Sequence, residues 1–263
     1  MDVIDYGVCR LAIVPVRIAP SDSAEQVTQL LFGDHYEVYA GSPDKQWISI
    51  NIIADQCKGW IDARQHHSIT LEYLEQINQA DFKITLDIAT VILYKKSPLT
   101  ILMGSIIPIS TSELFKVEEQ LAFNGEAKSL SQRRDFEFLK TMALRYANAP
   151  YQWGGKSPFG IDAGGLVQMV FKICGYSLHR EVVQQATQGK KVKSLSDARP
   201  GDLGFFSDKE GKAFHAGILL EDDKIIHAAG KVRLDHINEE GILNTETKIY
   251  THQLAGIRRI FAS

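Results

Sequence analysis

The sequence predicts an α+β protein in which small β-rich modules precede a domain of helices followed by an antiparallel sheet. Three observations predict this fold class. Short strand-like runs cut by Gly, Pro and Asp fill residues 6–65 and continue more faintly to about 125. An amphipathic helical period begins only after residue 130, and strand-like runs return after residue 200. We expect domains at 1–66, 67–125 and 126–263.

Composition and charge limit the functional class. With 263 residues, of which 44% are hydrophobic and 23% charged, the chain can bury one substantial core or two to three smaller ones. Its 29 basic and 32 acidic residues give a net charge of −3 and no cationic field for nucleic acid, so we expect no such partner. No window approaches the roughly 18 apolar residues of a membrane span. Residues 1–6 lack the pattern of a secretory signal, which predicts a cytoplasmic chain, or a periplasmic or cell-envelope one if a signal was removed.

The first 66 residues contain only short strands. The strand-like runs are 11–16, 27–32, 36–39 and 47–52. So many short strands in about sixty residues predict a small barrel. Leu-Phe-Gly at 31–33 is echoed by Leu-Met-Gly at 102–104, each ahead of another strand-like run. This echo predicts a second, diverged barrel, with chance similarity between short hairpins as the alternative.

Two helices and a set of strands follow the polar connector at 123–130. Ser131 is the expected N-cap of the first helix, and Asn148–Pro150 ends it. Its apolar face is Phe138, Leu139, Met142, Ala143 and Tyr146. The second helix is expected from about Ala163 to Cys174, with Gly175 as its C-cap. Its inward residues are Leu166, Val167, Met169, Val170 and Ile173. Strand-like runs then occur at 202–206, 216–220, 224–228, 232–234 and 257–261.

Cysteine and histidine spacing gives little sign of a metal site. Cys9, Cys57 and Cys174 are odd in number and far apart, which predicts buried reduced thiols and no disulfide framework. His35, His66, His67, His179, His236 and His252 show no ligand spacing and are interpreted as surface or loop residues. His215 and His227 differ, because each lies in a strand-like apolar run and twelve residues separate them. A single such His is usually a satisfied core residue.

These landmarks together resemble the catalytic domain of the NlpC/p60 cysteine peptidases over about residues 130–263. The residues that carry the resemblance are Tyr151-x-Trp-Gly-Gly155, Asp162, Leu178-x-Arg180, Gln185, Pro200-Gly-Asp202, His215-x-Gly217 and His227. The amino-terminal half resembles bacterial SH3-like modules, mainly through residues 30–33 and 59–61. The tandem arrangement is similar to γ-D-glutamyl-L-diamino acid endopeptidases. The resemblance implies a papain-like domain preceded by two SH3-like barrels.

The resemblance also assigns roles to individual residues. It places the nucleophile at position 163, at the first turn of a helix where a thiolate would be stabilised, but this chain has Ala163. His215 would be the general base and acid, and His227 would hold its ring. The twelve residues between them are as expected if the two lie on adjacent strands of a hairpin. Tyr151 would donate to the oxyanion. Among substrate-binding residues, Asp162 would pair with the amino group of an N-terminal L-Ala, and Trp153 would line the cleft. Gly164 stands where family members often carry Ser, and Arg180 is either a structural donor or a substrate contact.

Ala163 predicts that this polypeptide is inert, because loss of a nucleophile typically costs roughly a millionfold in turnover. The parent activity implied is hydrolysis of γ-D-glutamyl-L-diamino acid bonds in peptidoglycan-derived tri- and tetrapeptides, without metal or organic cofactor. Position 163 is then either an engineered Cys-to-Ala change or a natural pseudoenzyme's residue. The alternative function is a non-catalytic muropeptide-binding or cell-wall-targeting module. An acyl or amide transferase on the same scaffold is a third reading, and oligomeric state is not predicted.

Overall fold

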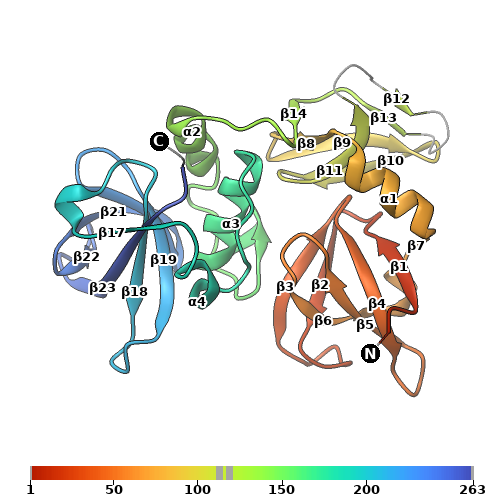
Figure 1. Cartoon of the computed structure of the whole chain (residues 1–263), viewed down its shortest axis with the longest axis horizontal. Helices are drawn as coiled ribbons and strands as arrows, with labels where there is room; N and C mark the ends of the chain where they lie inside the picture. The colour runs from red at the N-terminus through yellow and green to blue at the C-terminus, as the bar shows by residue number, and fades with distance from the viewer. Residues whose placement is uncertain (1, 111–114, 117–120, 262–263) are drawn as a thin grey trace. The chain divides into compact units, whose positions relative to one another are not determined.

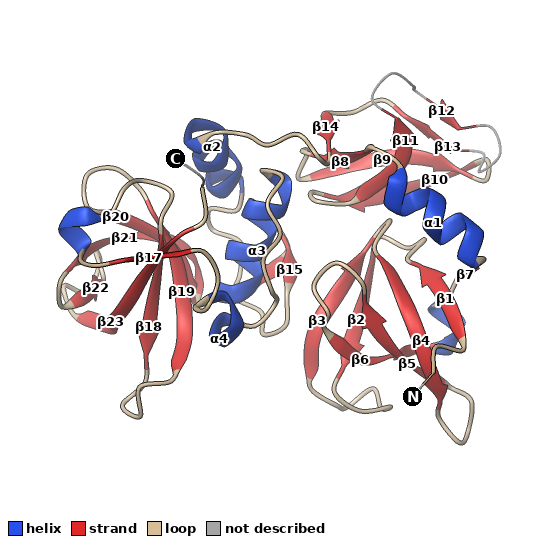
Figure 2. Cartoon of the chain, in the orientation of Figure 1, coloured by secondary structure: helices blue, strands red, loops and turns tan. Residues whose placement is uncertain are grey.

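The computed structural model describes residues 2–110, 115–116 and 121–261. Its contacts divide the chain into two compact units, unit 1 over Met1–Gln132 and unit 2 over Arg133–Ser263 (Figure 1). Figure 2 shows that strands predominate in unit 1, whereas unit 2 combines helices with a sheet. No helix in the described part of the chain has the length and apolar character needed to cross a membrane. The predicted α+β class is confirmed, and the predicted domain limits stay predictions.

The first part of unit 1 is one antiparallel sheet wrapped around a single core. Its strands run in the order β3-β2-β6-β5-β4-β1-β7. Alternation along the strands sends every second side chain inward, and the buried cluster is Cys9, Val14, Val16, Leu30, Tyr36, Val38, Ile50, Ile52 and Ile61. The elements are β1 (Asp5–Val8), β2 (Ile13–Arg17), β3 (Gln26–Leu31), β4 (His35–Gly41), β5 (Trp47–Ile52), β6 (Lys58–Asp62), η1 (Ala63–Gln65) and β7 (Ser68–Ile69).

The second part of unit 1 consists of a helix and two small sheets around a second core. The helix α1 was not predicted; Thr70 caps it by accepting a hydrogen bond from the Tyr73 N–H at 3.1 Å. The sheets have the orders β10-β9-β13-β12 and β11-β8-β14. Phe32, from the turn after β3, lies in the same core cluster as Ile92, Ile101 and Phe123. The elements are α1 (Leu71–Gln79), β8 (Phe82–Thr85), β9 (Ala89–Tyr94), β10 (Ser97–Leu102), β11 (Ile106–Ser110), β12 (Phe115–Lys116), β13 (Leu121–Phe123) and β14 (Ala127–Ser129).

The sequence echo between residues 31–33 and 102–104 corresponds to one turn that the chain makes twice. Gly33 and Gly104 both have a φ of +87°, a conformation that glycine adopts without steric cost. The next residues, Asp34 and Ser105, each accept a side-chain hydrogen bond from the backbone N–H three residues earlier, at 2.9 and 3.3 Å. The same backbone and the same bond favour a true repeat over chance similarity.

Unit 2 is a closed antiparallel sheet with helices packed on it. The sheet order is β17-β23-β18-β19-β20-β21-β22, and an additional β22–β23 pairing closes it. Its core is the cluster Val192, Phe206, Leu219, Ile225, Ile237, Ile242 and Ile257. The elements are α2 (Phe136–Arg145), β15 (Lys156–Ser157), β16 (Gly160–Ile161), α3 (Ala163–Ile173), α4 (Val182–Gln185), β17 (Lys190–Val192), η2 (Leu195–Asp197), β18 (Leu203–Ser207), β19 (Ala213–Leu219), β20 (Lys224–Ala229), β21 (Lys231–Asn238), β22 (Gly241–Leu243) and β23 (Tyr250–Arg259).

Helix α3 is the central element of unit 2. It packs against β19 and β20 and also contacts α2. The predicted inward residues are all buried. The C-cap is Cys174, one residue before the predicted Gly175, which follows it with a φ of +83°. The predicted N-cap of α2 was wrong: Asp135 accepts from the Phe138 N–H at 3.1 Å, and Ser131 lies four residues too early. All three cysteines are thiols, as predicted, and Cys9 and Cys174 are buried.

Candidate active site

The start of α3 is held by the carboxylate of Asp162. This residue is the N-cap and accepts hydrogen bonds from the N–H groups of Gly165 at 2.7 Å and Gly154 at 2.8 Å. The guanidinium of Arg180 donates to both oxygens of the same carboxylate, at 2.9 and 2.6 Å. Four donors therefore surround Asp162, which makes it a positioning group for the first turn of the helix.

Arg180 is a buried structural donor. It is 3% exposed, and besides the two bonds to Asp162 it donates to the carbonyl oxygen of Gly155 at 3.3 Å. A bidentate Arg–carboxylate pair fixes both side chains in direction as well as distance. Of the two roles predicted for Arg180, the contacts support the structural one. A substrate contact by Arg180 or Asp162 stays a prediction.

Position 163 is the first residue of α3, and its neighbour has no room for a side chain. Ala163 is 5% exposed, so the predicted nucleophile position lies in a nearly closed place at the positive end of the helix dipole. A Cβ built on Gly164 would lie 2.7 Å from the Arg180 carbonyl oxygen. Gln185 also donates to the carbonyl oxygen of Gly164 at 2.9 Å. Glycine is therefore required here sterically, and a Ser hydroxyl at 164 would need a backbone shift.

Tyr151 and Trp153 lie on the segment that leads into this helix. Tyr151 forms an isolated β-bridge with Ile161 and is 40% exposed. Burial raises the pKa of its phenol; the nearby Asp162 carboxylate raises it further, and Arg180 opposes that effect. The phenol therefore remains a hydrogen-bond donor at neutral pH. Trp153 is 57% exposed. The roles predicted for both residues stay predictions.

The two predicted histidines meet in the sheet. His215 on β19 and His227 on β20 are buried, and His215 Nε2 lies 2.8 Å from His227 Nδ1. The β19–β20 register pairs Gly217 with His227, which brings the rings within reach of one another. Burial, followed by the charges of His252 and His227, holds the pKa of His215 well below its ordinary value. The hairpin contact that the twelve-residue spacing predicted is present.

Asp235 extends this pair and was not predicted. His227 Nε2 lies 3.0 Å from Asp235 Oδ2 on β21, and the carboxylate is 1% exposed. Although burial raises its pKa, hydrogen bonds from His227, Arg233 and Thr245 lower the pKa of Asp235 well below its ordinary value. The register pairs His227 with Arg233, so Asp235 is the diagonal neighbour on the same face. A hairpin turn placed at Gly230 sets Arg233 opposite His227, so the sequence could have indicated Asp235 as the diagonal neighbour of His227.

His252 corrects the prediction of a surface or loop residue. It lies on β23, and its ring stacks on that of His215 with centroids 4.0 Å apart and planes 25° from parallel. Burial and, after it, the charge of His227 lower the pKa of His252 to about 4, against an opposing effect of the Asp235 charge. The pairing of β23 within the closed sheet brings His252 to His215, and no local sequence pattern around residue 252 predicts this contact.

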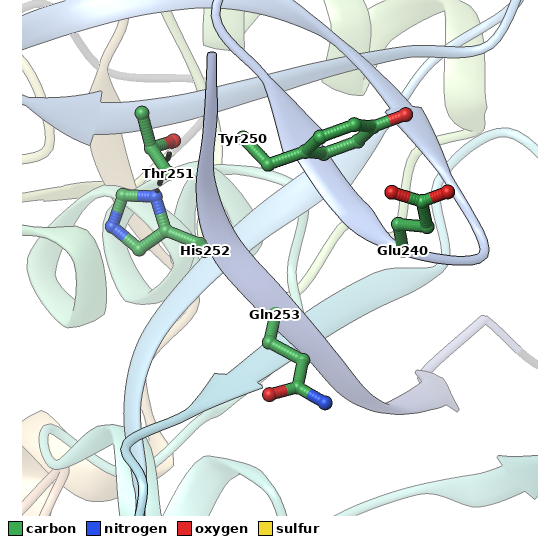
Figure 3. Close-up of a pocket in the computed structure, with 5 residues that line it drawn as sticks. All are labelled: Glu240, Tyr250, Thr251, His252 and Gln253. Atoms are coloured by element: carbon green, nitrogen blue, oxygen red, sulfur yellow. Dashed lines mark hydrogen bonds between the residues drawn. The ribbon is translucent and has the colours of Figure 1, made fainter.

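A pocket of about 380 Å³ adjoins His252 (Figure 3). It is lined by Glu240, Tyr250, Thr251, His252 and Gln253. Figure 3 shows the Thr251–His252 hydrogen bond, 2.8 Å long, on one side of β23 and the Tyr250 ring with the Glu240 carboxylate on the other. The pocket offers one carboxylate and several neutral polar groups.

Three histidines lie close enough to raise the question of a metal site, which the sequence did not predict. Ligand atoms of His215, His227 and His252 lie within 4.8 Å of one another. Metal binding requires in-plane lone pairs that converge on one point. Here a hydrogen bond joins His215 to His227, and the nearly parallel stack keeps the lone pairs of His215 and His252 from converging. The arrangement fits proton transfer better than metal ligation.

The site thus has two assemblies on elements that pack together. One is the start of α3 with Asp162, Arg180 and Gly164; the other is the set of histidines with Asp235 in the sheet. Helix α3 packs against β19 and β20, the strands that carry His215 and His227. Covalent acyl transfer uses a nucleophile at a helix N-terminus together with an imidazole base. Here the helix start and the imidazole pair are present on elements that pack together, and position 163 holds Ala.

Family comparisons agree with this class of site. Residues 148–253 match the NlpC/P60 family, and residues 16–65 match the bacterial dipeptidyl-peptidase Sh3 domain. The chain is 30% identical over 258 residues to the gamma-D-glutamyl-L-lysine dipeptidyl-peptidase of Bacillus subtilis, covering 89% of this chain and 81% of that protein. It is also 37% identical over 116 residues to a bifunctional muramidase/DL-endopeptidase of the same species, which covers 43% of this chain and 32% of that protein.

Solved structures show the same fold. An NlpC/P60 family protein from Bacillus cereus superposes with a TM-score of 0.81 at 18% identity, covering 97% of this chain and 99% of that one. An NlpC/P60 endopeptidase from Photobacterium damselae subsp. piscicida gives 0.72 at 15% identity, covering 96% and 72%. The fold and the site define a papain-like peptidase scaffold with an SH3-like module. The chain belongs to the NlpC/P60 family.

Proposed function

We propose that this chain is the Cys-to-Ala form of a cysteine peptidase that cleaves γ-D-glutamyl-L-diamino acid bonds in peptidoglycan-derived peptides. The observation that carries the proposal is the buried series His215, His227 and Asp235, in a sheet against which α3 packs with position 163 at its first residue. Such a series activates a nucleophile and has no evident use in a protein that only packs a core.

The proposed reaction proceeds through an acyl-enzyme. In the Ala163→Cys variant, His215 takes the thiol proton and the thiolate attacks the γ-carbonyl carbon of D-Glu. The Asp162 carboxylate at the helix start would oppose a thiolate, but the Arg180 guanidinium balances its charge. His215 then gives its proton to the leaving amine as the C–N bond breaks. Water hydrolyses the thioester, which restores the thiol and releases the peptide acid.

The substrate class follows from the relatives and from the helix start. The Bacillus subtilis relative is named for a γ-D-glutamyl-L-lysine bond, so we propose tri- and tetrapeptides with a free N-terminal L-Ala and Lys or another diamino acid after γ-D-Glu. Asp162 is the proposed partner of the substrate amine, through a carboxylate that also holds α3. The cellular compartment stays a prediction, cytoplasmic for the chain as it stands.

Restoration of the thiol tests the proposal. The Ala163→Cys variant is incubated with L-Ala-γ-D-Glu-L-Lys, and the products are separated by liquid chromatography. Release of L-Ala-γ-D-Glu that is lost again when His215→Ala is added supports the peptidase. A folded Ala163→Cys protein that binds the tripeptide and never cleaves it would overturn the proposal.

Ala163 itself favours a second candidate, a muropeptide-binding module without catalysis. A methyl group at this position cannot form an acyl-enzyme, and Gly164 is sterically required beside it. In this case the unsubstituted chain binds the tripeptide in calorimetry and the thiol variant gains no turnover. The same experiment therefore separates the two candidates.

A further inference from the structure

We propose that Asp235 is a positioning residue that determines which ring nitrogen of His215 is the base. The inference deepens the proposed function and rests on it for its catalytic meaning. The ring nitrogens of His215 and His227 that carry protons are the same whether or not a substrate is cleaved, so they can be measured independently of activity.

The contacts of Asp235 leave it only one hydrogen-bonding role. Oδ1 accepts from Thr245 N at 2.8 Å, Thr245 Oγ1 at 2.9 Å and Arg233 Nη2 at 3.1 Å. Oδ2 accepts from Arg233 Nε at 2.7 Å and faces His227 Nε2 at 3.0 Å. An ionised carboxylate held this way only accepts hydrogen bonds, so Nε2 of His227 must carry the proton and donate it.

The proton on His227 in turn dictates the proton on His215. His227 is 1% exposed, and Asp235 is already paired with Arg233, so a second proton on His227 would place another positive charge in the core. In neutral His227 the proton on Nε2 leaves Nδ1 as an acceptor. The only proton that can fill the 2.8 Å contact is therefore on Nε2 of His215. Nδ1 of His215 then keeps its lone pair and is the basic nitrogen.

The other charged or titratable groups around this series do not compete for these positions. His252 covers the face of the His215 ring, and its Nδ1 is hydrogen-bonded to Thr251 at 2.8 Å. Glu246 faces the outer side of the Arg233 guanidinium at 3.4 Å. A stacked ring restricts rotation of its neighbour without taking an in-plane hydrogen bond. The proton order therefore originates at Asp235.

Nuclear magnetic resonance of the unsubstituted chain tests the proton positions directly. Long-range ¹H–¹⁵N correlation of ¹⁵N-histidine distinguishes a protonated from a bare ring nitrogen. At pH 7.5 we expect both His215 and His227 to carry the proton on Nε2. A His215 that carries its proton on Nδ1 would overturn the proposal without any variant.

The Asp235→Asn variant tests the cause. Whichever way the amide is oriented, its NH₂ group faces either His227 or the donors from Thr245, so we expect the single fixed tautomer to be lost. Asp202→Asn is the matched control, because Asp202 is also buried and paired with an arginine, Arg259, at 2.8 and 2.7 Å, but contacts no histidine in the described structure. It should leave both tautomers unchanged. Equal tautomer spectra for the two folded variants would refute the role of Asp235.

Kinetics in the Ala163→Cys background give the second readout. Asp235→Asn should lower kcat between about 100-fold and 10,000-fold with little change in KM, since outer carboxylates that orient a catalytic imidazole have effects of this size. Asp202→Asn should leave kcat within a few-fold. If the tautomers agree with the proposal but the thiol variant is inactive, the proposed function fails and the proton order stands. If Asp235→Asn turns over as fast as Asp202→Asn, the positioning role fails alone.

Discussion

Lowering the pH from 7 to 5 should destabilise unit 2 through His252. The folded pKa of His252 is about 4, against an ordinary value of 6.5. A folded pKa below the unfolded one means that the stability contribution is complete above pH 6.5 and is lost as the pH falls toward 4. His215, whose pKa is also lowered, acts in the same direction.

The magnitude follows from the two pKa values. At pH 5 the unfolded imidazole is almost fully protonated, whereas the folded one is mostly neutral, which corresponds to about 2 kcal/mol. His252 is only partly buried, and solvent screening reduces this to about 1 kcal/mol. The His252→Phe variant keeps an aromatic ring in the stack and cannot titrate.

The assay is urea unfolding in which samples at each urea concentration are labelled briefly by amide hydrogen exchange. Mass spectrometry of peptides from β20 and β21 reports the free energy of unfolding of unit 2 separately from unit 1. Between pH 7 and pH 5 the unsubstituted chain should lose about 1 kcal/mol more than His252→Phe. An equal loss of unfolding free energy in the two proteins would show that burial in the stack does not lower the pKa of His252.

Two further variants test the helix start. Gly164→Ser should lower the free energy of unfolding of unit 2 by about 1 to 3 kcal/mol, because its Cβ would meet the Arg180 carbonyl oxygen at 2.7 Å. The control in the same urea assay is Gly256→Ser, since a Cβ on Gly256 meets nothing within 4 Å. Arg180→Gln should cost about 3 to 5 kcal/mol by leaving the Asp162 carboxylate buried without its charge partner. The exposed pair of Arg64 offers a contrast, since Arg64→Gln should produce no measurable change by differential scanning calorimetry. Similar costs for the two arginine variants would contradict the structural role of Arg180.

The elements of unit 2 were largely predictable from the sequence because their signals are local. The apolar period of α3 and the glycine after it define the helix within one residue of its observed end. The N-cap of α2 was misplaced because Ser131 and Asp135 are both good capping residues, and only the backbone at residue 135 decides between them. Helix α1 was missed because the β-rich pattern on both sides dominated that stretch.

The candidate site was predicted where a hairpin supplies the contact and missed where the closed sheet does. The spacing of His215 and His227 implied adjacent strands, and their rings meet. Asp235 needs the register of the next hairpin as well, since it pairs diagonally with His227. His252 needs the pairing of β23 with β18 and β22, long-range contacts that no local periodicity encodes.

The steric requirement at Gly164 means that residues 163 and 164, although neighbours, tolerate substitution differently. Ala163 is the first residue of a capped, buried helix, so replacing one hydrogen of its methyl group by a sulfhydryl would add a reactive group without altering the Asp162 cap. Position 164 abuts the peptide group of residue 180, so any side chain there would move the segment that carries the buried guanidinium. A change at residue 163 alone could therefore remove or restore the nucleophile, whereas residue 164 is held by packing and would change only together with the loop beside it.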